Sequence, residues 1–333
     1  MTNERRTRIA VYSLGGTIAM TPQPEGGVAP ALSAAELLAA VPALADLGID
    51  IEAHDFRRLP GASLGFRDLL ALTAEIEAQL RTGIDGVVVT QGTDTIEETA
   101  YLLDLVHSGD APIVVTGAMR GATAAGADGP ANVLAALRVA ASTDARGLGC
   151  LVVFADEIHA ARYVRKTHTT SVKAFRSYPG PVGYLAEAGV YISMRPARSP
   201  YISDIDPTRT VRTAVVPATL GDDGTVLQAV VGKLDGLVVA GFGVGHVPAT
   251  WVPTLAGLAE RIPVVLASRT GTGPVLAATY GFVGSESDLR SRGLLSAGSL
   301  DPFKARILLH LLLMASIDRA SIQTRIGGAA AVR

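Results

Sequence analysis

Hydroxyl and carboxylate side chains follow two glycine-containing turns of this chain, each placed directly after an apolar segment. Thr93 and Asp94 come after the segment 87–92, and Thr17 comes after the glycine pair at 15–16. A hydroxyl group can attack a carbonyl carbon or position a water molecule, and a carboxylate can accept the ammonium group of a small ligand. These residue types suit chemistry on a small amino compound.

A purely structural role fits the same residues. Asp94 is suited to cap the N-terminus of a helix, and Glu97, three residues later, would complete a capping box. Thr17 is equally suited to a turn or cap position. From these two stretches alone, the chemical and the capping interpretations both stay open.

Strand, turn and helix follow one another around Thr93. Residues 87–89 are consecutive valines, which are typical of a strand buried on both faces. Gly92 breaks this segment, and residues 96–103 contain good helix formers with acidic residues in the first turn. Ligands of open α/β sheets bind outside the carboxyl ends of the strands, so we expect Thr93 and Asp94 at such a crevice.

The alternation of strand and helix extends through the first half of the chain. Strands are expected at 9–14, 49–53, 112–115 and 148–154, and helices at 33–45, 66–82 and up to 141. The proline- and glycine-rich segment 21–30 is expected to be a loop, either a mobile lid or a plain connector. Ser63 precedes the second of these helices, so it is a third hydroxyl in a strand-to-helix loop. The pattern predicts a parallel sheet with helices on both faces.

A change in composition divides the chain. Residues 196–213 combine prolines and charges with little periodicity, which indicates a linker. The α/β alternation then resumes, with strands expected at 214–216, 236–240 and 263–267 and helices at 251–261 and 301–316. We predict two α/β domains. The larger N-terminal one, residues 1–195, has a mainly parallel sheet flanked by helices, and the smaller C-terminal one spans 214–333.

Composition argues against several classes of protein. Lys and Arg total 29 against 31 Asp and Glu, a formal net charge of −2, so no basic excess points to nucleic acid. No apolar segment has the length of a membrane helix, and the start does not resemble a signal peptide, so we expect a cytoplasmic protein. The single cysteine, Cys150, excludes an intramolecular disulfide. The histidines show no metal-ligand spacing with it, so neither a metal nor another cofactor is expected.

Several short motifs occur together and in a fixed order. They are residues 14–19 (LGGTIA), 91–100 (QGTDTIEETA), 116–120 (TGAMR), 127–130 (ADGP) with Asn132, 164–170 (VRKTHTT), 280–282 (YGF) and 300–306 (LDPFKAR). One glycine turn with a threonine is a weak signal, but this combination is specific. The chain resembles the bacterial L-asparaginase family over nearly its whole length.

The resemblance implies hydrolysis of asparagine to aspartate and ammonia through an acyl-enzyme on a threonine. It implies Thr17 as the first nucleophile, and Thr93, Asp94 and Lys166 as a second catalytic group. A threonine hydroxyl is a weak nucleophile until a neighbour takes its proton. A lysine can take that proton when desolvation in a closed pocket lowers the pKa of its ammonium group. Lys166 lies in the basic segment 162–177, which is otherwise typical of a solvated face.

The resemblance also implies how substrate is held. Ser63 would hold the α-carboxylate, Asp94 would bind the α-amino group, and the backbone around Ala118 and Thr93 would face the amide. Family members are usually homotetramers, dimers of intimate dimers, in which the second domain of a partner subunit completes each site. His246 and Glu286 fall near the segments that make this contribution.

Three positions depart from the usual family pattern. The loop after the first threonine usually carries a tyrosine that helps to activate it, whereas Val28 stands there in this chain. Leu64 follows the substrate-binding serine where a polar residue is common, and His246 replaces the partner-supplied asparagine of many members. These departures bear on efficiency and substrate preference more than on the reaction class. Tyr12 is the nearest alternative tyrosine, but it precedes the glycine turn and is expected to point into the core.

Two alternatives to asparagine hydrolysis stay open. One is a relative that acts on another amide, such as glutamine or an N-substituted asparagine. The other is a weakly active relative that binds amino acids in the pocket that holds the substrate in other family members. The presence of both threonines together with Asp94 and Lys166 argues against the binding protein.

Overall fold

The chain separates into two compact units, Met1–Ser199 and Pro200–Arg333. The computed structural model describes residues 5–16, 18, 20–22, 28–30, 32–42 and 44–330. The boundary falls inside the segment 196–213, for which a linker is predicted.

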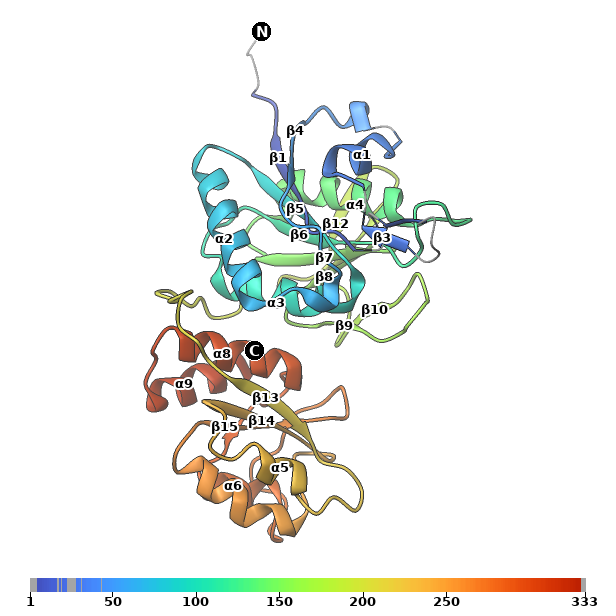
Figure 1. Ribbon diagram of the computed structural model, residues 1–333. Coiled ribbons are helices and arrows are strands. Elements are labelled where there is room, and N and C mark those ends of the chain that lie inside the picture. Colours follow the sequence, from blue (N-terminus) through green and yellow to red (C-terminus); the bar gives the residue numbers. More distant parts are fainter. Residues whose placement is uncertain are drawn as a thin grey trace. The chain divides into compact units, whose positions relative to one another are not determined.

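An eight-stranded sheet forms the centre of the first unit, in the order β12-β11-β8-β7-β6-β5-β1-β4 (Figure 1). Its strands are β1 (Arg8–Ser13), β4 (Asp50–Asp55), β5 (Gly86–Thr90), β6 (Ile113–Thr116), β7 (Cys150–Phe154), β8 (Glu157–Ala160), β11 (Gly183–Ala186) and β12 (Gly189–Ile192). Strands β4, β1, β5, β6 and β7 are parallel, whereas β8, β11 and β12 continue the sheet antiparallel. The prediction of a mainly parallel sheet is therefore confirmed.

The register of the central strands brings three loops to one edge of the sheet. Thr90, the last residue of β5, lies beside Ser13 at the end of β1 and beside Thr116 at the end of β6. The segments that follow these residues therefore leave the sheet at neighbouring points. All five residues of β5 are buried, as expected of a parallel strand with both faces covered.

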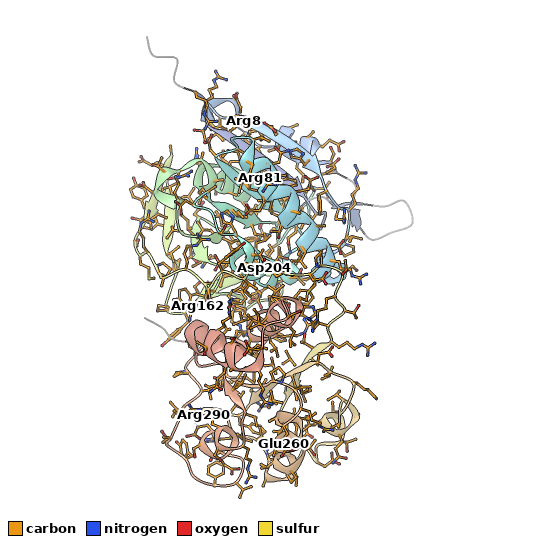
Figure 2. All side chains as sticks on the ribbon, turned by 90° about the vertical axis from the view of Figure 1, so that its left-hand side faces the viewer. Arg8, Arg81, Arg162, Asp204, Glu260 and Arg290 are labelled. Carbon is orange, nitrogen blue, oxygen red and sulfur yellow. The ribbon has the colours of Figure 1, made fainter. Side chains whose placement is uncertain are left out.

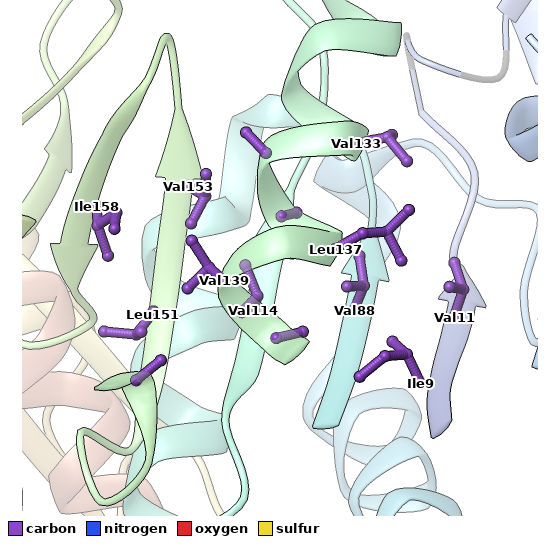
Figure 3. Close-up of a cluster of buried hydrophobic side chains, with 14 of the residues drawn as sticks. Ile9, Val11, Val88, Val114, Val133, Leu137, Val139, Leu151, Val153 and Ile158 are labelled. Carbon is purple, nitrogen blue, oxygen red and sulfur yellow. The ribbon is translucent and has the colours of Figure 1, made fainter. Parts of the chain in front are cut away.

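Helices cover both faces of this sheet (Figure 1). Helices α2 (Phe66–Arg81) and α3 (Ile96–Val106) lie on one face, and α1 (Ala34–Ala39) and α4 (Gly129–Ala141) lie on the other. Figure 3 shows the core beneath α4, where strand residues meet the helix: Ile9, Val11, Val88, Val114, Val133, Leu137 and Val139. This aliphatic packing fixes the strands from which the candidate site residues emerge.

Two predictions about the segment after β1 are wrong in part. Residues 21–30 are not simply a loop, because β2 (Met20–Pro22) and β3 (Val28–Pro30) form an antiparallel pair. The expected helix 33–45 is shorter: α1 spans Ala34–Ala39, and a 3₁₀ turn follows at Leu44–Leu47. Pro42 explains the early end, because the residue before a proline avoids the helical conformation. Ser33 and Glu36 form the expected capping box.

A second antiparallel pair lies apart from the main sheet. Strands β9 (Val164–Lys166) and β10 (Phe175–Ser177) form a two-stranded sheet of their own. Phe175 packs on Phe154 at the end of β7, with ring centroids 4.8 Å apart. The basic segment 162–177 is thus partly inside the fold.

The second unit is a smaller α/β domain. Strands β13 (Thr213–Pro217), β14 (Gly236–Gly241), β15 (Val264–Ser268) and β16 (Leu295–Ser296) form a parallel sheet in chain order. The helices are α5 (Thr225–Ala229), α6 (Val252–Ala259), α7 (Glu286–Ser291), α8 (Pro302–Met314) and α9 (Arg319–Ala330). Helices α5 and α6 lie on one face of the sheet and α8 on the other (Figure 1).

Several charged side chains lie on the exterior of each unit. Arg81 is exposed at the end of α2, and Glu260 and Arg290 are exposed in the second unit (Figure 2). Among the residues that the structure describes, no helix has the length and apolarity needed to cross a membrane.

Candidate active site

Three glycines bring the loops after β1, β4 and β5 into backbone contact. A Cβ atom added to Gly16 would lie 2.8 Å from the carbonyl carbon of Gln91 and closer still to the backbone of Gly92. A Cβ atom added to Gly61 would lie 2.9 Å from the carbonyl oxygen of Gly92. Side chains other than hydrogen do not fit between these turns, which explains the glycines. The contact gathers the loops that carry Ser63 and Thr93. Gly16 directly precedes Thr17, which lies outside the described residues.

Lys166 joins the turn after β5 from β9. Thr93 is buried in the 3₁₀ turn Thr93–Thr95, and the Nζ atom of Lys166 donates to its Oγ1 over 2.9 Å. The same Nζ lies 3.2 Å from Oδ1 of Asp94. The lysine side chain is 18% exposed, whereas that of Asp94 is 61% exposed. A buried hydroxyl therefore contacts a partly buried amine, beside a carboxylate that a ligand can reach.

The capping interpretation of Asp94 is wrong. Helix α3 begins at Ile96, so Thr95 occupies the N-cap position, and no side-chain hydrogen bond caps the helix within the described residues. The carboxylate of Glu97 does not complete a capping box either. It accepts a hydrogen bond from the main-chain nitrogen of Lys166. Asp94 and Glu97 thus both contact Lys166.

Gln91 and Thr95 form a polar link that the sequence patterns did not reveal. The buried Gln91 donates through Nε2 to Oγ1 of Thr95 over 3.2 Å. Thr95 in turn donates to the carbonyl oxygen of Gly61 over 2.9 Å. Ser63 is exposed at the end of the 3₁₀ turn that starts at Gly61. The link therefore holds the serine turn against the start of α3. An amide side chain directly after a strand of valines was the available signal.

The turn that carries Ala118 is fixed from α4. Oδ2 and Oδ1 of Asp128 accept from the main-chain nitrogens of Met119 and Arg120 over 3.0 and 2.9 Å. Asn132 donates to the carbonyl oxygen of Gly117, the residue before Ala118, over 3.0 Å. Ala118 itself is buried. Its backbone is thus immobilised beside the end of β6.

Tyr12 does not face this cluster as an acid or base would. It is buried in β1 and stacks on His54, with ring centroids 4.8 Å apart. Burial, reinforced by the charges of Glu75 and Glu52, raises the pKa of Tyr12 to about 12. Its hydroxyl has no hydrogen-bond partner among the described residues. The expectation that Tyr12 points into the core is confirmed. Val28 lies in β3, and its side chain is outside the described part.

His246 and Glu286 meet within the second unit. Nε2 of His246 lies 3.2 Å from Oε2 of the fully buried Glu286. The imidazole also contacts the half-exposed rings of Tyr280 and Phe282 at centroid distances of 4.8 and 4.9 Å. Burial raises the pKa of Glu286, but hydrogen bonds from the amides of Tyr280, Glu286 and Thr279, and from His246, outweigh it and leave the pKa below its ordinary value. The pair therefore presents a histidine held by an ionised carboxylate.

The geometry defines a class of protein. A hydroxyl–lysine pair beside an accessible carboxylate, at the carboxyl ends of parallel strands, is an α/β site suited to nucleophilic catalysis on a small molecule. In the described part of the chain, no group of three or more His, Cys, Asp or Glu side chains could hold a metal ion.

Comparison with known proteins identifies the family. Residues 8–198 match the family described as "Asparaginase, N-terminal", and residues 212–325 match "Glutaminase/Asparaginase C-terminal domain". The chain is 38% identical to a probable L-asparaginase of Deinococcus radiodurans, over 95% of this chain and 96% of that protein. It is 34% identical to an L-asparaginase of Bacillus licheniformis, over 92% and 95%. The crystal structure of a probable cytoplasmic L-asparaginase from Campylobacter jejuni superposes with a TM-score of 0.86 at 33% identity, over 96% of this chain and 99% of that one. The chain belongs to the asparaginase family.

Proposed function

We propose that this protein hydrolyses L-asparagine to L-aspartate and ammonia through an acyl-enzyme on Thr17. The observation that carries the proposal is the contact of Lys166 Nζ with Thr93 Oγ1, 2.9 Å apart and next to Asp94, in a chain of this family. A buried threonine hydroxyl that contacts an amine has a route for its proton. No metal or other cofactor takes part in this proposal.

Each polar group of the substrate is bound by a different part of the site. The exposed carboxylate of Asp94 accepts the α-ammonium group. The hydroxyl of Ser63, which is exposed on its turn, holds the α-carboxylate. The immobilised backbone at Ala118 and Thr93 faces the side-chain amide, where preorganised N–H groups stabilise the oxyanion.

The reaction proceeds in two balanced steps. The hydroxyl oxygen of Thr17 bonds to the amide carbon, and the carbon–nitrogen bond breaks. The threonine proton leaves with ammonia, passed through the Thr93–Lys166 pair. Water then attacks the ester carbon, and one of its protons returns to Thr17 as the aspartate side chain is released.

An ammonia-release assay with asparagine, with glutamine and without substrate tests this function. Thr17→Val keeps the shape of the side chain and removes the hydroxyl, so the rate should fall by about 10⁴-fold or more. Thr73→Val is a matched control, because it removes a hydroxyl that donates to Leu69 within α2. Near-normal ammonia release by Thr17→Val, or equal losses in both variants, would reject the assignment. Faster release from glutamine than from asparagine would favour the alternative amide, which the family description also includes.

The active assembly in this proposal is a cytoplasmic homotetramer, a dimer of intimate dimers, in which His246 and Glu286 complete the site of a partner subunit. The half-exposed aromatic rings around His246 support an interface there, since such rings are enriched at protein contacts. Mixing two inactive variants, Thr17→Val and Glu286→Gln, should restore part of the activity. In a mixed dimer, one site combines the intact Thr17 of one subunit with the intact Glu286 of the other. Sedimentation at assay concentration checks the assembly, and an active monomer would refute it.

A further inference from the structure

The main-chain nitrogen of Lys166 points away from its own β-sheet. Lys166 lies opposite Phe175 in the antiparallel pair of β9 and β10, and the next residue, Thr167, donates its N–H to Ala174 over 2.7 Å. In an antiparallel pair, hydrogen-bonded and non-hydrogen-bonded positions alternate. Lys166 is therefore at a non-hydrogen-bonded position, and its N–H faces outward from β10. The acceptor that it meets there is the carboxylate of Glu97.

Both ends of Lys166 are consequently held by one short stretch of chain. Glu97, in the first turn of α3, binds the main chain of Lys166, while Thr93 and Asp94 bind its Nζ atom. The side chain between these points has four rotatable bonds, so Nζ follows the main chain only loosely. Anchoring the main chain to the helix that directly follows the turn of Thr93 removes much of that freedom. β9 belongs to a separate two-stranded sheet, so no strand of the eight-stranded sheet is hydrogen-bonded to it, and the bond to Glu97 ties its end to α3.

We propose that Glu97 is a positioning residue, which sets the distance between Lys166 Nζ and Thr93 Oγ1 by binding the main chain of Lys166. The inference rests on the proposed function, in which the distance between Lys166 Nζ and Thr93 Oγ1 allows a proton to pass between them. Glu97 acts through Lys166, and the part of its carboxylate that matters is the hydrogen-bond acceptor.

Substitutions of Glu97 separate this role from a general role in the helix. Glu97→Ala removes the acceptor. Glu97→Gln removes the charge but keeps an oxygen that can accept the N–H of Lys166. Glu98→Ala is the matched control, because Glu98 is also an acidic residue in the first turn of α3. A displacement of about 1 Å in a catalytic group costs about 10²-fold in rate. We expect kcat to fall by about 10- to 100-fold in Glu97→Ala with KM changed less than about threefold. Glu97→Gln should keep kcat within about threefold of the parent, and Glu98→Ala should as well.

A second measurement does not depend on activity. The chain has four lysines, so labelling with [¹⁵N]lysine gives four main-chain amide signals, and Lys166→Arg identifies the one that belongs to Lys166. This amide should be protected from hydrogen exchange in the parent and in Glu97→Gln, and should lose at least about tenfold of that protection in Glu97→Ala.

Three results would overturn the inference: an unchanged kcat in Glu97→Ala, equal losses of kcat in Glu97→Ala and Glu98→Ala, or hydrogen-exchange protection of the Lys166 amide that is the same in Glu97→Ala as in the parent. A parent protein that releases no ammonia from asparagine would instead refute the proposed function. In that case the amide measurement still decides whether Glu97 holds Lys166.

Discussion

Replacing Gly16 by alanine tests whether the contact between glycine turns sets the geometry of the site. Gly16 has a φ of +87°, and its added Cβ atom would lie well inside the 3.0 Å that real Cβ atoms keep from the backbone of Gly92. The two turns would have to separate by about 1 Å, and a displacement of that size near reacting groups costs about 10²-fold in rate. The positive φ adds about 1–2 kcal/mol of destabilisation. We expect kcat/KM for asparagine to fall by about 10²-fold and the free energy of unfolding to fall by at least about 2 kcal/mol.

Two further glycine substitutions separate the causes. Gly83 has a φ of +92°, but its added Cβ atom would lie 3.7 Å from the nearest atoms, which belong to arginine side chains. Gly83→Ala therefore carries the backbone strain without the steric contact, and should cost about 1–2 kcal/mol with activity unchanged. Gly61→Ala carries the contact, at 2.9 Å from Gly92, without a positive φ. It should lower the activity more than the stability.

The assay is ammonia release at saturating and subsaturating asparagine, with urea unfolding of each variant. Gly16→Ala and Gly61→Ala should share a loss of rate, while Gly16→Ala and Gly83→Ala share a loss of stability. A Gly16→Ala protein with the activity and stability of Gly83→Ala would refute the reasoning. It would mean that the turns can separate without disturbing the site.

Four other outcomes are expected. Thr93→Val, Lys166→Met and the double variant should show similar residual rates in the ammonia assay, because residues that act as a unit do not give multiplicative losses. Tyr12→Phe should change kcat less than tenfold, since its hydroxyl is buried with a pKa of about 12; a larger loss with normal circular dichroism would give it a catalytic role. Thr95→Val removes the hydrogen bond to the serine turn, worth about 0.5–1.5 kcal/mol, and should raise KM about 2- to 10-fold with kcat nearly constant. Burial, together with the positive charge of Arg306, lowers the pKa of His310 from 6.5 to about 4, so protonation of this histidine favours the unfolded chain. The contribution of His310 to the free energy of unfolding should be complete above pH 6.5 and should fall by about 3 kcal/mol as the pH drops to 4. Urea titrations in which His310→Gln shows the same pH slope would contradict that assignment.

Local hydrophobic patterns in the sequence were enough to predict the parallel core. Consecutive valines such as 87–89 are buried at both faces of β5, and the parallel pairing of β5 with β1 and β6 agrees with the alternation of strand and helix. The antiparallel strands β8, β11 and β12 were not predicted. They are four residues long each, and only β8 is largely buried, so they carry little hydrophobic periodicity. Strands of this kind depend on a neighbour that the sequence does not identify.

Glu97 illustrates the same limit within the candidate site. Its position three residues after Asp94 fits a capping box, which is a local pattern. The actual partner, the main chain of Lys166, lies 69 positions away and is brought there by a separate hairpin. A carboxylate is as good an acceptor for a distant amide as for a nearby one, so spacing alone could not decide between them. The polar link from Gln91 to Thr95 was missed for the same reason, since its end point is the distant Gly61.

Asp94 connects substrate binding to the position of Lys166. One oxygen of its carboxylate lies 3.2 Å from Lys166 Nζ, yet the side chain is 61% exposed, so acceptor sites on the same carboxylate face the solvent. If the substrate ammonium group binds there, as we propose, a second positive charge comes close to that of Lys166. The same carboxylate would then contact both the substrate ammonium group and the amine that lies 2.9 Å from Thr93 Oγ1. The residue that selects an α-amino acid would thereby also fix the position of Lys166 relative to the bound substrate.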